Sequence, residues 1–193
     1  YFKKLDKILS YLLDKDYVLT NTSLVNRRIF KHKSCQGINV GKTWHVDTHY
    51  LGTGEILGRG RKLNKGFSYQ IILMLEDFMK NNGSTLYIPG SHLFRKKPIR
   101  NSNYKYKTMT GKKGSMVIFD SGLWHKGGKP TNESRWSIFS YYVPWFVKPY
   151  YRFGDMIGKN KIKKLDKQIR KLLHYNSTPP INAHERANTV TKI

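Results

Sequence analysis

Hydrophobic residues near the N-terminus recur at spacings of three and four, and lysines fill the positions between them. The apolar positions are Phe2, Leu5, Ile8, Leu9, Leu12 and Leu13. This spacing places them on one face of a helix, so the sequence predicts an amphipathic helix that packs against the core. The same spacing returns over residues 162–173, where lysines and arginines cover the remaining face. It predicts a second, strongly basic helix.

Between these helices the apolar residues come in short or alternating runs bounded by Gly, Asn and Pro, which is typical of β-strands. The expected strands cover residues 18–24, 43–47, 69–75, 85–88, 115–119 and 135–143. Many strands with helices at the chain ends favour a β-sandwich or small barrel over an alternating βαβ array. We therefore predict a mainly β fold with flanking helices. The sequence does not decide which face of the 69–75 strand points inward. One face carries Gln70, Ile72 and Met74, and the other carries Tyr69, Ile71 and Leu73.

The length of 193 residues is close to that of one domain, so we expect a single domain over 1–193, with 177–193 as an extended tail. Lys and Arg number 36 against 12 Asp and Glu, which gives a formal charge of +24. Such a charge attracts phosphates, carboxylates, nucleic acid or anionic membrane surfaces without choosing among them. A basic compositional bias without functional meaning fits equally well. The basic segments 52–66 and 95–113 read as long loops.

Cysteine use and hydropathy bound the location of the protein. The single cysteine, Cys35, forms no internal disulfide, which favours an intracellular, cytoplasmic location. The longest apolar run, at Ile71 to Leu75, is far shorter than a membrane span, so we expect no integral membrane association. The first residue is Tyr1 rather than Met, so the expected location is provisional with respect to a signal peptide.

Candidate chemistry begins at Trp44-His45-Val46-Asp47. If these residues form a strand, the side chains of His45 and Asp47 lie side by side on one face. His125 follows a predicted strand and the Ser121-Gly122 turn, and is the best placed third ligand. Two histidines and one carboxylate form the facial triad of non-haem Fe(II) oxygenases, which leaves three coordination positions open. If the strand continues past Asp47, His49 shares the same face and is a rival ligand.

Arg135 and Ser137 share one face of the last predicted strand. If this face points inward, a guanidinium and a hydroxyl enter the same space as the metal, and arginine is suited to bidentate binding of a carboxylate. The alternative is a surface ion pair of Arg135 with Asp120 or Glu133.

An ordered set of segments then resembles a known family. These are the Trp44 to Asp47 segment, Leu75-Glu76-Asp77, the run from Asn81 through Pro89-Gly90-Ser91-His92, and the 114–120 strand leading to His125 and Arg135. Together they look like the phytanoyl-CoA dioxygenase family of Fe(II)- and 2-oxoglutarate-dependent oxygenases, over about residues 44–143. The resemblance implies a cupin-like double-stranded β-helix, or jelly-roll.

The resemblance also implies roles for five residues. His45, Asp47 and His125 would bind Fe(II), Arg135 would hold the distal carboxylate of 2-oxoglutarate, and Ser137 would add a hydrogen bond to that carboxylate. With O2, such a site hydroxylates a C–H bond and releases succinate and CO2. Related halogenases carry a small residue in place of the carboxylate ligand, so Asp47 favours hydroxylation, with desaturation or cyclisation left open.

The charge and the sequence do not identify the substrate. We expect a small or medium-sized, anionic substrate that approaches through the basic loops. Three alternatives remain. An oxygenase acting on nucleic acid fits the charge and the alternation of Tyr104 and Tyr106 with lysines. A basic, non-catalytic jelly-roll binding protein and a zinc hydrolase with the same three ligands are the others. The sequence does not determine the oligomeric state.

Overall fold

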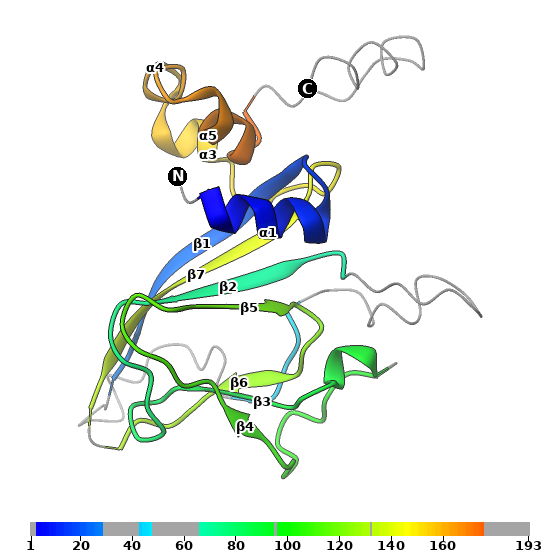
Figure 1. Cartoon of the computed structure of the whole chain (residues 1–193), viewed down its shortest axis with the longest axis vertical. Helices are drawn as coiled ribbons and strands as arrows, with labels where there is room; N and C mark the ends of the chain where they lie inside the picture. The colour runs from blue at the N-terminus through cyan, green and yellow to red at the C-terminus, as the bar shows by residue number, and fades with distance from the viewer. Residues whose placement is uncertain (1–2, 29–42, 48–65, 95, 132, 176–193) are drawn as a thin grey trace.

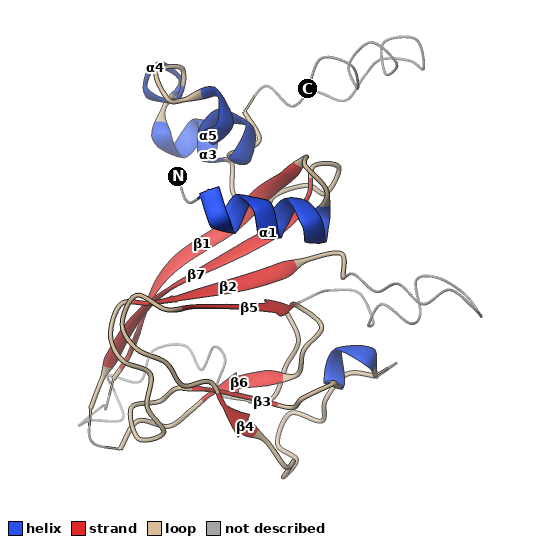
Figure 2. Cartoon of the chain, in the orientation of Figure 1, coloured by secondary structure: helices blue, strands red, loops and turns tan. Residues whose placement is uncertain are grey.

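Two antiparallel sheets face each other in the computed structural model, which describes residues 3–28, 43–47, 66–94, 96–131 and 133–175 (Figures 1 and 2). The larger sheet has the order β1-β7-β2-β5. Its strands are β1 (Tyr17–Arg27), β7 (Arg135–Pro144), β2 (Tyr69–Met74) and β5 (Met116–Asp120). The smaller sheet has the order β4-β3-β6, with β4 (Lys107–Thr108), β3 (Thr85–Tyr87) and β6 (His125–Gly127). This arrangement is the predicted mainly β jelly-roll core.

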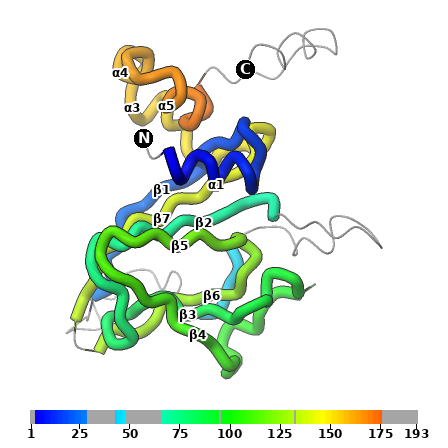
Figure 3. Tube along the Cα trace, viewed as in Figure 1, coloured from blue at the N-terminus to red at the C-terminus, as the bar shows by residue number. Residues whose placement is uncertain are grey.

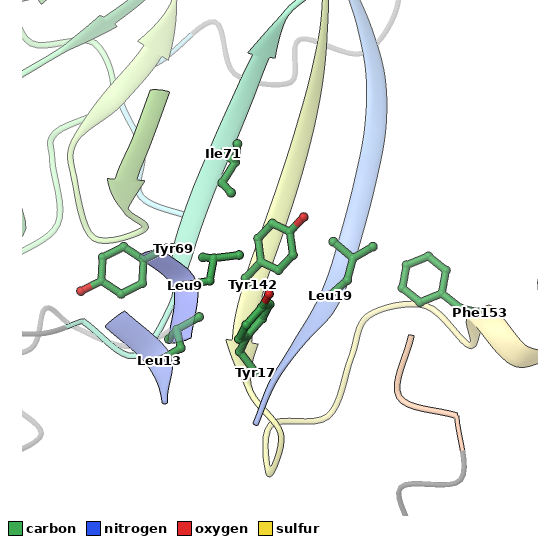
Figure 4. Packing of buried hydrophobic residues seen from close by; sticks show 8 residues of the cluster. All are labelled: Leu9, Leu13, Tyr17, Leu19, Tyr69, Ile71, Tyr142 and Phe153. Atoms are coloured by element: carbon green, nitrogen blue, oxygen red, sulfur yellow. The ribbon is translucent and has the colours of Figure 1, made fainter. Parts of the chain in front are cut away.

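The predicted N-terminal helix is confirmed as α1 (Lys3–Leu13), which covers the outer face of the larger sheet (Figure 1). Its apolar stripe buries Leu9 and Leu13 against Tyr17, Tyr69 and Tyr142 on the strands below (Figure 4). Burial of apolar area of this kind contributes most of the stability of such a layer.

The predicted basic helix over 162–173 is wrong as one continuous element. The structure has α3 (Phe153–Ile157), which the sequence analysis missed, then α4 (Lys159–Ile162) and α5 (Lys167–Leu172). Asp166 interrupts the helical run, because its carboxylate accepts a hydrogen bond from the backbone N–H of Gln168 (2.7 Å) and starts a new helix. The three short helices lie together at one end of the larger sheet (Figure 3).

The strand predictions need two corrections. Residues 43–47 form an isolated β-bridge at His45 rather than a full strand. β4 and β6 were not predicted, and β4 lies inside the segment 95–113 that reads as a loop. Strands of two and three residues give too little alternation to be recognised, and all three residues of β6 are polar or glycine.

β2 lies at the centre of the larger sheet and is covered on both faces. Tyr69 and Ile71 pack beneath α1, whereas Ile72 and Met74 join Phe119 in a second cluster on the opposite face. This settles the inward face as the one that carries Gln70, Ile72 and Met74. No helix among the described residues is long and apolar enough to cross a membrane.

Candidate metal centre

Three predicted ligands converge between the sheets. One potential ligand atom from each of His45, Asp47 and His125 lies within 4.8 Å of the other two. His125 Nε2 is 2.9 Å from Asp47 Oδ2, and His45 Nε2 is 3.6 Å from Asp47 Oδ1. Chain segments some 80 residues apart in sequence thus form the group that the spacing predicted.

Backbone pairing holds the two histidines together. His45 and His125 exchange two backbone hydrogen bonds of 3.0 Å in the bridge between their segments, and their rings lie 4.3 Å apart between centroids. The backbone N–H of Asp47 donates to the carbonyl of Ser121 (3.1 Å). The Trp44 to Asp47 segment is therefore fixed along the edge of β6, which places all three side chains on one side.

Hydrogen bonds also determine which ring nitrogens are free. Nδ1 of His45 lies 2.7 Å from the carbonyl of Thr43, and Nδ1 of His125 lies 2.8 Å from the carbonyl of Leu123. A carbonyl only accepts, so Nδ1 carries the proton in both rings. Nε2 of each ring faces Asp47, and once Nε2 has lost its proton its lone pair is available to a metal ion.

Burial and mutual charge shape the protonation of the group. Burial, and then the adjacent His125 ring, lower the pKa of His45. Burial alone would raise the pKa of Asp47, but its hydrogen bond to His125 and the charges of both imidazoles lower it overall. Burial alone would lower the pKa of His125, but the Asp47 carboxylate raises it overall. Asp47 is thus held as a carboxylate, the form that binds metal.

The larger sheet contributes Gln70, which the sequence analysis did not assign to the site. The Gln70 amide donates a hydrogen bond to Asp47 Oδ2 from the inner face of β2. Phe119 on β5 packs edge-on against the His125 ring, with centroids 5.2 Å apart. Gln70 is a polar residue within the otherwise apolar run of β2, and this signal was present in the sequence.

Arg135 is buried in the interior, at 1% exposed, rather than paired at the surface with Asp120 or Glu133. Its guanidinium donates to Ser137 Oγ (3.1 Å) and to the carbonyl of Gly83 (2.8 Å), and it lies 3.6 Å from the centroid of the Phe78 ring. Its Nε has no hydrogen-bond partner, and no ion pair reaches Arg135 within the described residues.

Electrostatics around Arg135 favour a bound anion. Burial, and then the charge of Arg27, lower the pKa of Arg135 to about 9, while Glu76 opposes the shift. The guanidinium remains charged at neutral pH, and a charge held in the interior without an ion pair is costly. A carboxylate ligand would offset this cost through the free N–H and a bidentate contact.

Two turns support these groups. Asn82 is buried and hydrogen-bonded to Met79, Asp77 and Ser84, and Gly83 follows it at a φ of 77°, which glycine adopts without strain. This turn aims the Gly83 carbonyl at Arg135. In the second turn Ser91 Oγ donates to the carbonyl of Ile88 (2.7 Å) and accepts from the N–H of Trp124 (2.8 Å). The residue before His125 is thereby anchored.

Aromatic rings pack around the two segments that carry His45 and His125. Tyr104 packs edge-on against both Trp44 and Trp124, at 5.8 and 5.3 Å between centroids, and Lys126 Nζ lies 4.6 Å from the centroid of the Trp44 ring. Trp44 and Trp124 each precede a predicted ligand. Tyr104 therefore packs against the scaffold of the centre, while Tyr106 remains half exposed.

The remaining histidines lie elsewhere or outside the described residues. His92 is next to Asp120, whose carboxyl pKa it lowers although burial raises that pKa overall. His174 Nε2 donates to the carbonyl of Trp145 (2.9 Å) in the terminal helical region. His49, the rival ligand, lies outside the described residues, as do His32 and His184.

Comparison with protein-family models gives a match to phytanoyl-CoA dioxygenase (PhyH) over residues 3–136. The matched span is more than two thirds of the chain. The chain belongs to the phytanoyl-CoA dioxygenase family. The match begins well before the 44–143 region in which the motifs occur, so the family features include α1 and β1.

Two curated relatives match this chain over part of their length. An uncharacterised protein of Mycobacterium tuberculosis is 27% identical over 122 residues, which cover 61% of this chain and 44% of that protein. Dioxygenase af480 of Aspergillus fumigatus is 28% identical over 111 residues, covering 55% of this chain and 36% of that protein. The matched part of the chain thus spans less than half the length of these relatives.

Solved structures share the fold. The structure of EctD from S. alaskensis with 2-oxoglutarate and 5-hydroxyectoine superposes with a TM-score of 0.54 at 21% identity, covering 76% of this chain and 52% of that one. The epimerase SnoN in complex with Fe3+, alpha-ketoglutarate and nogalamycin RO gives a TM-score of 0.53 at 17% identity, covering 76% and 58%. These likenesses support the jelly-roll assignment.

Proposed function

We propose that this protein is an Fe(II)- and 2-oxoglutarate-dependent dioxygenase that hydroxylates a C–H bond of a small or medium-sized, anionic substrate and releases succinate and CO2. The observation that carries the proposal is the buried Arg135, without an ion pair in the described region, inside the same two-sheet interior as the His45, Asp47 and His125 group. Metal binding alone does not require a guanidinium in the interior, whereas binding of a diacid cosubstrate requires a cation for its distal carboxylate.

The donor set fits iron. Two imidazole nitrogens and one carboxylate, all on one side, match the ligands of non-haem Fe(II) sites and leave positions open for reactants. Both histidines offer Nε2 because Nδ1 donates to a backbone carbonyl. When bound, Fe(II) together with 2-oxoglutarate supplies the means to activate O2 and oxidise a C–H bond. The ligands in the EctD and SnoN structures support this choice of cofactors.

Each side chain then has a distinct task. His45, Asp47 and His125 would hold the metal, and Gln70 would fix the orientation of the Asp47 carboxylate. Arg135 would bind the distal carboxylate of 2-oxoglutarate through paired N–H groups, and Ser137 Oγ, 3.1 Å from Nη1, would hold the guanidinium in place and contact the same carboxylate. The apolar side chains of Phe78 and Phe119 would exclude water around these groups.

Hydroxylation is the expected outcome because the carboxylate of Asp47 occupies the position that a halide would need. The formal charge of +24 favours an anionic substrate through long-range attraction. The nucleic-acid alternative keeps the same centre and stays a prediction. Packing of Tyr104 against two tryptophans removes one of the two rings suggested for base stacking.

Succinate production from 2-oxoglutarate under Fe(II) and O2 tests the proposal. We expect slow, substrate-independent decarboxylation by the wild type, and its loss in His45→Ala and in Arg135→Met. His174→Ala is the matched control for loss of an imidazole, because His174 lies in the terminal helical region. A wild type that binds Fe(II) but forms no succinate with any anionic, neutral or nucleic-acid substrate offered would contradict the proposal.

A further inference from the structure

A second arginine lies beside Arg135 on the inner face of the larger sheet. In the antiparallel pairing of β1 with β7, Arg27 is directly opposite Arg135. Side chains at opposed positions lie on the same face of a sheet, about 5 Å apart at Cβ. Because Arg135 points into the interior, Arg27 points there too. Like charges at opposed positions repel each other, so an anion bound between the two arginines would be favoured.

Glycines make the space that the Arg27 side chain enters. A Cβ at Gly127 would overlap the Arg27 guanidinium, and a Cβ at Gly83 would come within 3.3 Å of the Arg27 Cβ. Gly127 follows His125 by two residues on β6, so it lies on the same strand face as that metal-ligand candidate. The Arg27 guanidinium therefore lies against the inner face of the smaller sheet, next to His125.

Electrostatic effects agree with this position. The charge of Arg27 lowers the pKa of both Arg135 and His45, and burial lowers the pKa of Arg27 itself. Strand register places Arg27 opposite Arg135, and the close approach to Gly127 places its guanidinium against β6, the strand that carries His125.

We propose that Arg27 is a second carboxylate-binding residue, and that the distal carboxylate of 2-oxoglutarate is bound between Arg27 and Arg135. The inference rests on the proposed function. A carboxylate between two guanidinia offsets their mutual repulsion and their burial, and it accepts charge-assisted hydrogen bonds from both. Gly127 is then the residue that keeps the path of the Arg27 side chain open.

The test measures binding of 2-oxoglutarate to the Mn(II)-loaded protein by calorimetry without O2, so turnover is not needed. Arg27→Gln is expected to weaken binding about 10- to 100-fold, the range for a lost charge-assisted hydrogen bond. Gly127→Ala, which keeps the charge but displaces the guanidinium, is expected to weaken binding less. Arg100→Gln, which removes an exposed arginine, is the control and should leave binding unchanged.

A second ligand identifies which end of the molecule Arg27 contacts. 2-Oxopentanoate has the same chain length and the same chelating end as 2-oxoglutarate but lacks the distal carboxylate. Arg27→Gln should leave its binding unchanged. Equal losses for both ligands, or no loss for 2-oxoglutarate, would overturn the inference. A wild type that binds no 2-oxoglutarate would instead overturn the proposed function. Thermal unfolding of each metal-free variant separates binding defects from misfolding.

Discussion

Both faces of β2 are buried, but only the inner face combines apolar residues with a polar residue of the candidate site. On the outer face Tyr69 and Ile71 pack beneath Leu9 and Leu13 of α1 in a hydrophobic cluster. On the inner face the same strand offers Gln70 to a carboxylate of the candidate metal centre. One strand of six residues thus belongs both to the stabilising core and to the chemistry.

The difference lies in how each face meets the cost of burial. Apolar side chains on the outer face gain free energy when they leave water. The inner face holds Gln70, Arg135, Ser137 and His125, all buried, whose burial is unfavourable unless each polar group finds a partner. Arg135 Nε lacks a partner in the described residues. The outer face therefore contributes to stability, whereas the inner face combines a second apolar cluster with polar groups arranged for a ligand.

Removal of a metal ligand is expected to have the largest effect on the inner face. His125→Ala is expected to reduce succinate formation to the level of a protein-free control, because two ligands do not hold Fe(II) in a defined geometry. The melting temperature of the metal-free protein should change little. Enzyme assay and thermal unfolding measure the two effects. A variant that keeps wild-type turnover would show that His125 is not a ligand.

Removing an outer-face side chain should do the reverse. Leu9 is 1% exposed, and Leu9→Ala is expected to lower the free energy of unfolding by about 2–5 kcal/mol, as for other buried leucines. Ile8→Ala on the same helix is the control, because Ile8 is 37% exposed and should cost far less. Chemical denaturation measures both. Mn(II) affinity of the folded Leu9→Ala protein should equal that of the wild type; a large loss would mean that the two faces are coupled.

The sequence predicts the apolar elements of the fold better than it predicts the polar contacts of the candidate site. The spacing of apolar residues was enough to predict α1, and the alternation along 135–143 was enough to place Arg135 and Ser137 on one face. Gln70 was missed as a site residue because its partner Asp47 is 23 residues away in sequence and lies outside β2, in the segment that pairs with β6. β6 was missed because a three-residue strand that carries a ligand and a glycine has no hydrophobic period.

The basic C-terminal segment shows a second limit of prediction from hydrophobic spacing. Its apolar spacing is helical over 162–173, yet the side chain of Asp166 caps a new helix start and divides the segment. Local hydrogen bonding of an Asp side chain competes with a continuous helix, and hydrophobic periodicity does not report it. Arg27 is a third case, because its relation to Arg135 depends on strand register, which is set by the whole sheet.

A milder change on the inner face tests whether Gln70 positions Asp47. Gln70→Leu is expected to lower Mn(II) affinity about 10- to 100-fold, as for other residues that orient a metal ligand. Stability should stay the same or rise, because an apolar side chain replaces a buried amide. Calorimetry with Mn(II) measures the first effect, and Gln168→Leu in exposed α5 is the control. If Mn(II) affinity is unchanged, Gln70 has no part in orienting Asp47.

The smallest expected effect concerns Ser137, which is fully buried and accepts a hydrogen bond from Arg135. Ser137→Ala removes one hydrogen bond to a guanidinium that keeps its bond to Gly83, so affinity for 2-oxoglutarate should fall about 3- to 10-fold. Ser140→Ala is the matched control, because Ser140 is on the same strand but bonds Thr22 on the opposite face. Calorimetry with the Mn(II)-loaded protein compares the two variants. Equal affinities would place Ser137 in the scaffold alone, and would leave Arg135 as the carboxylate-binding group of β7.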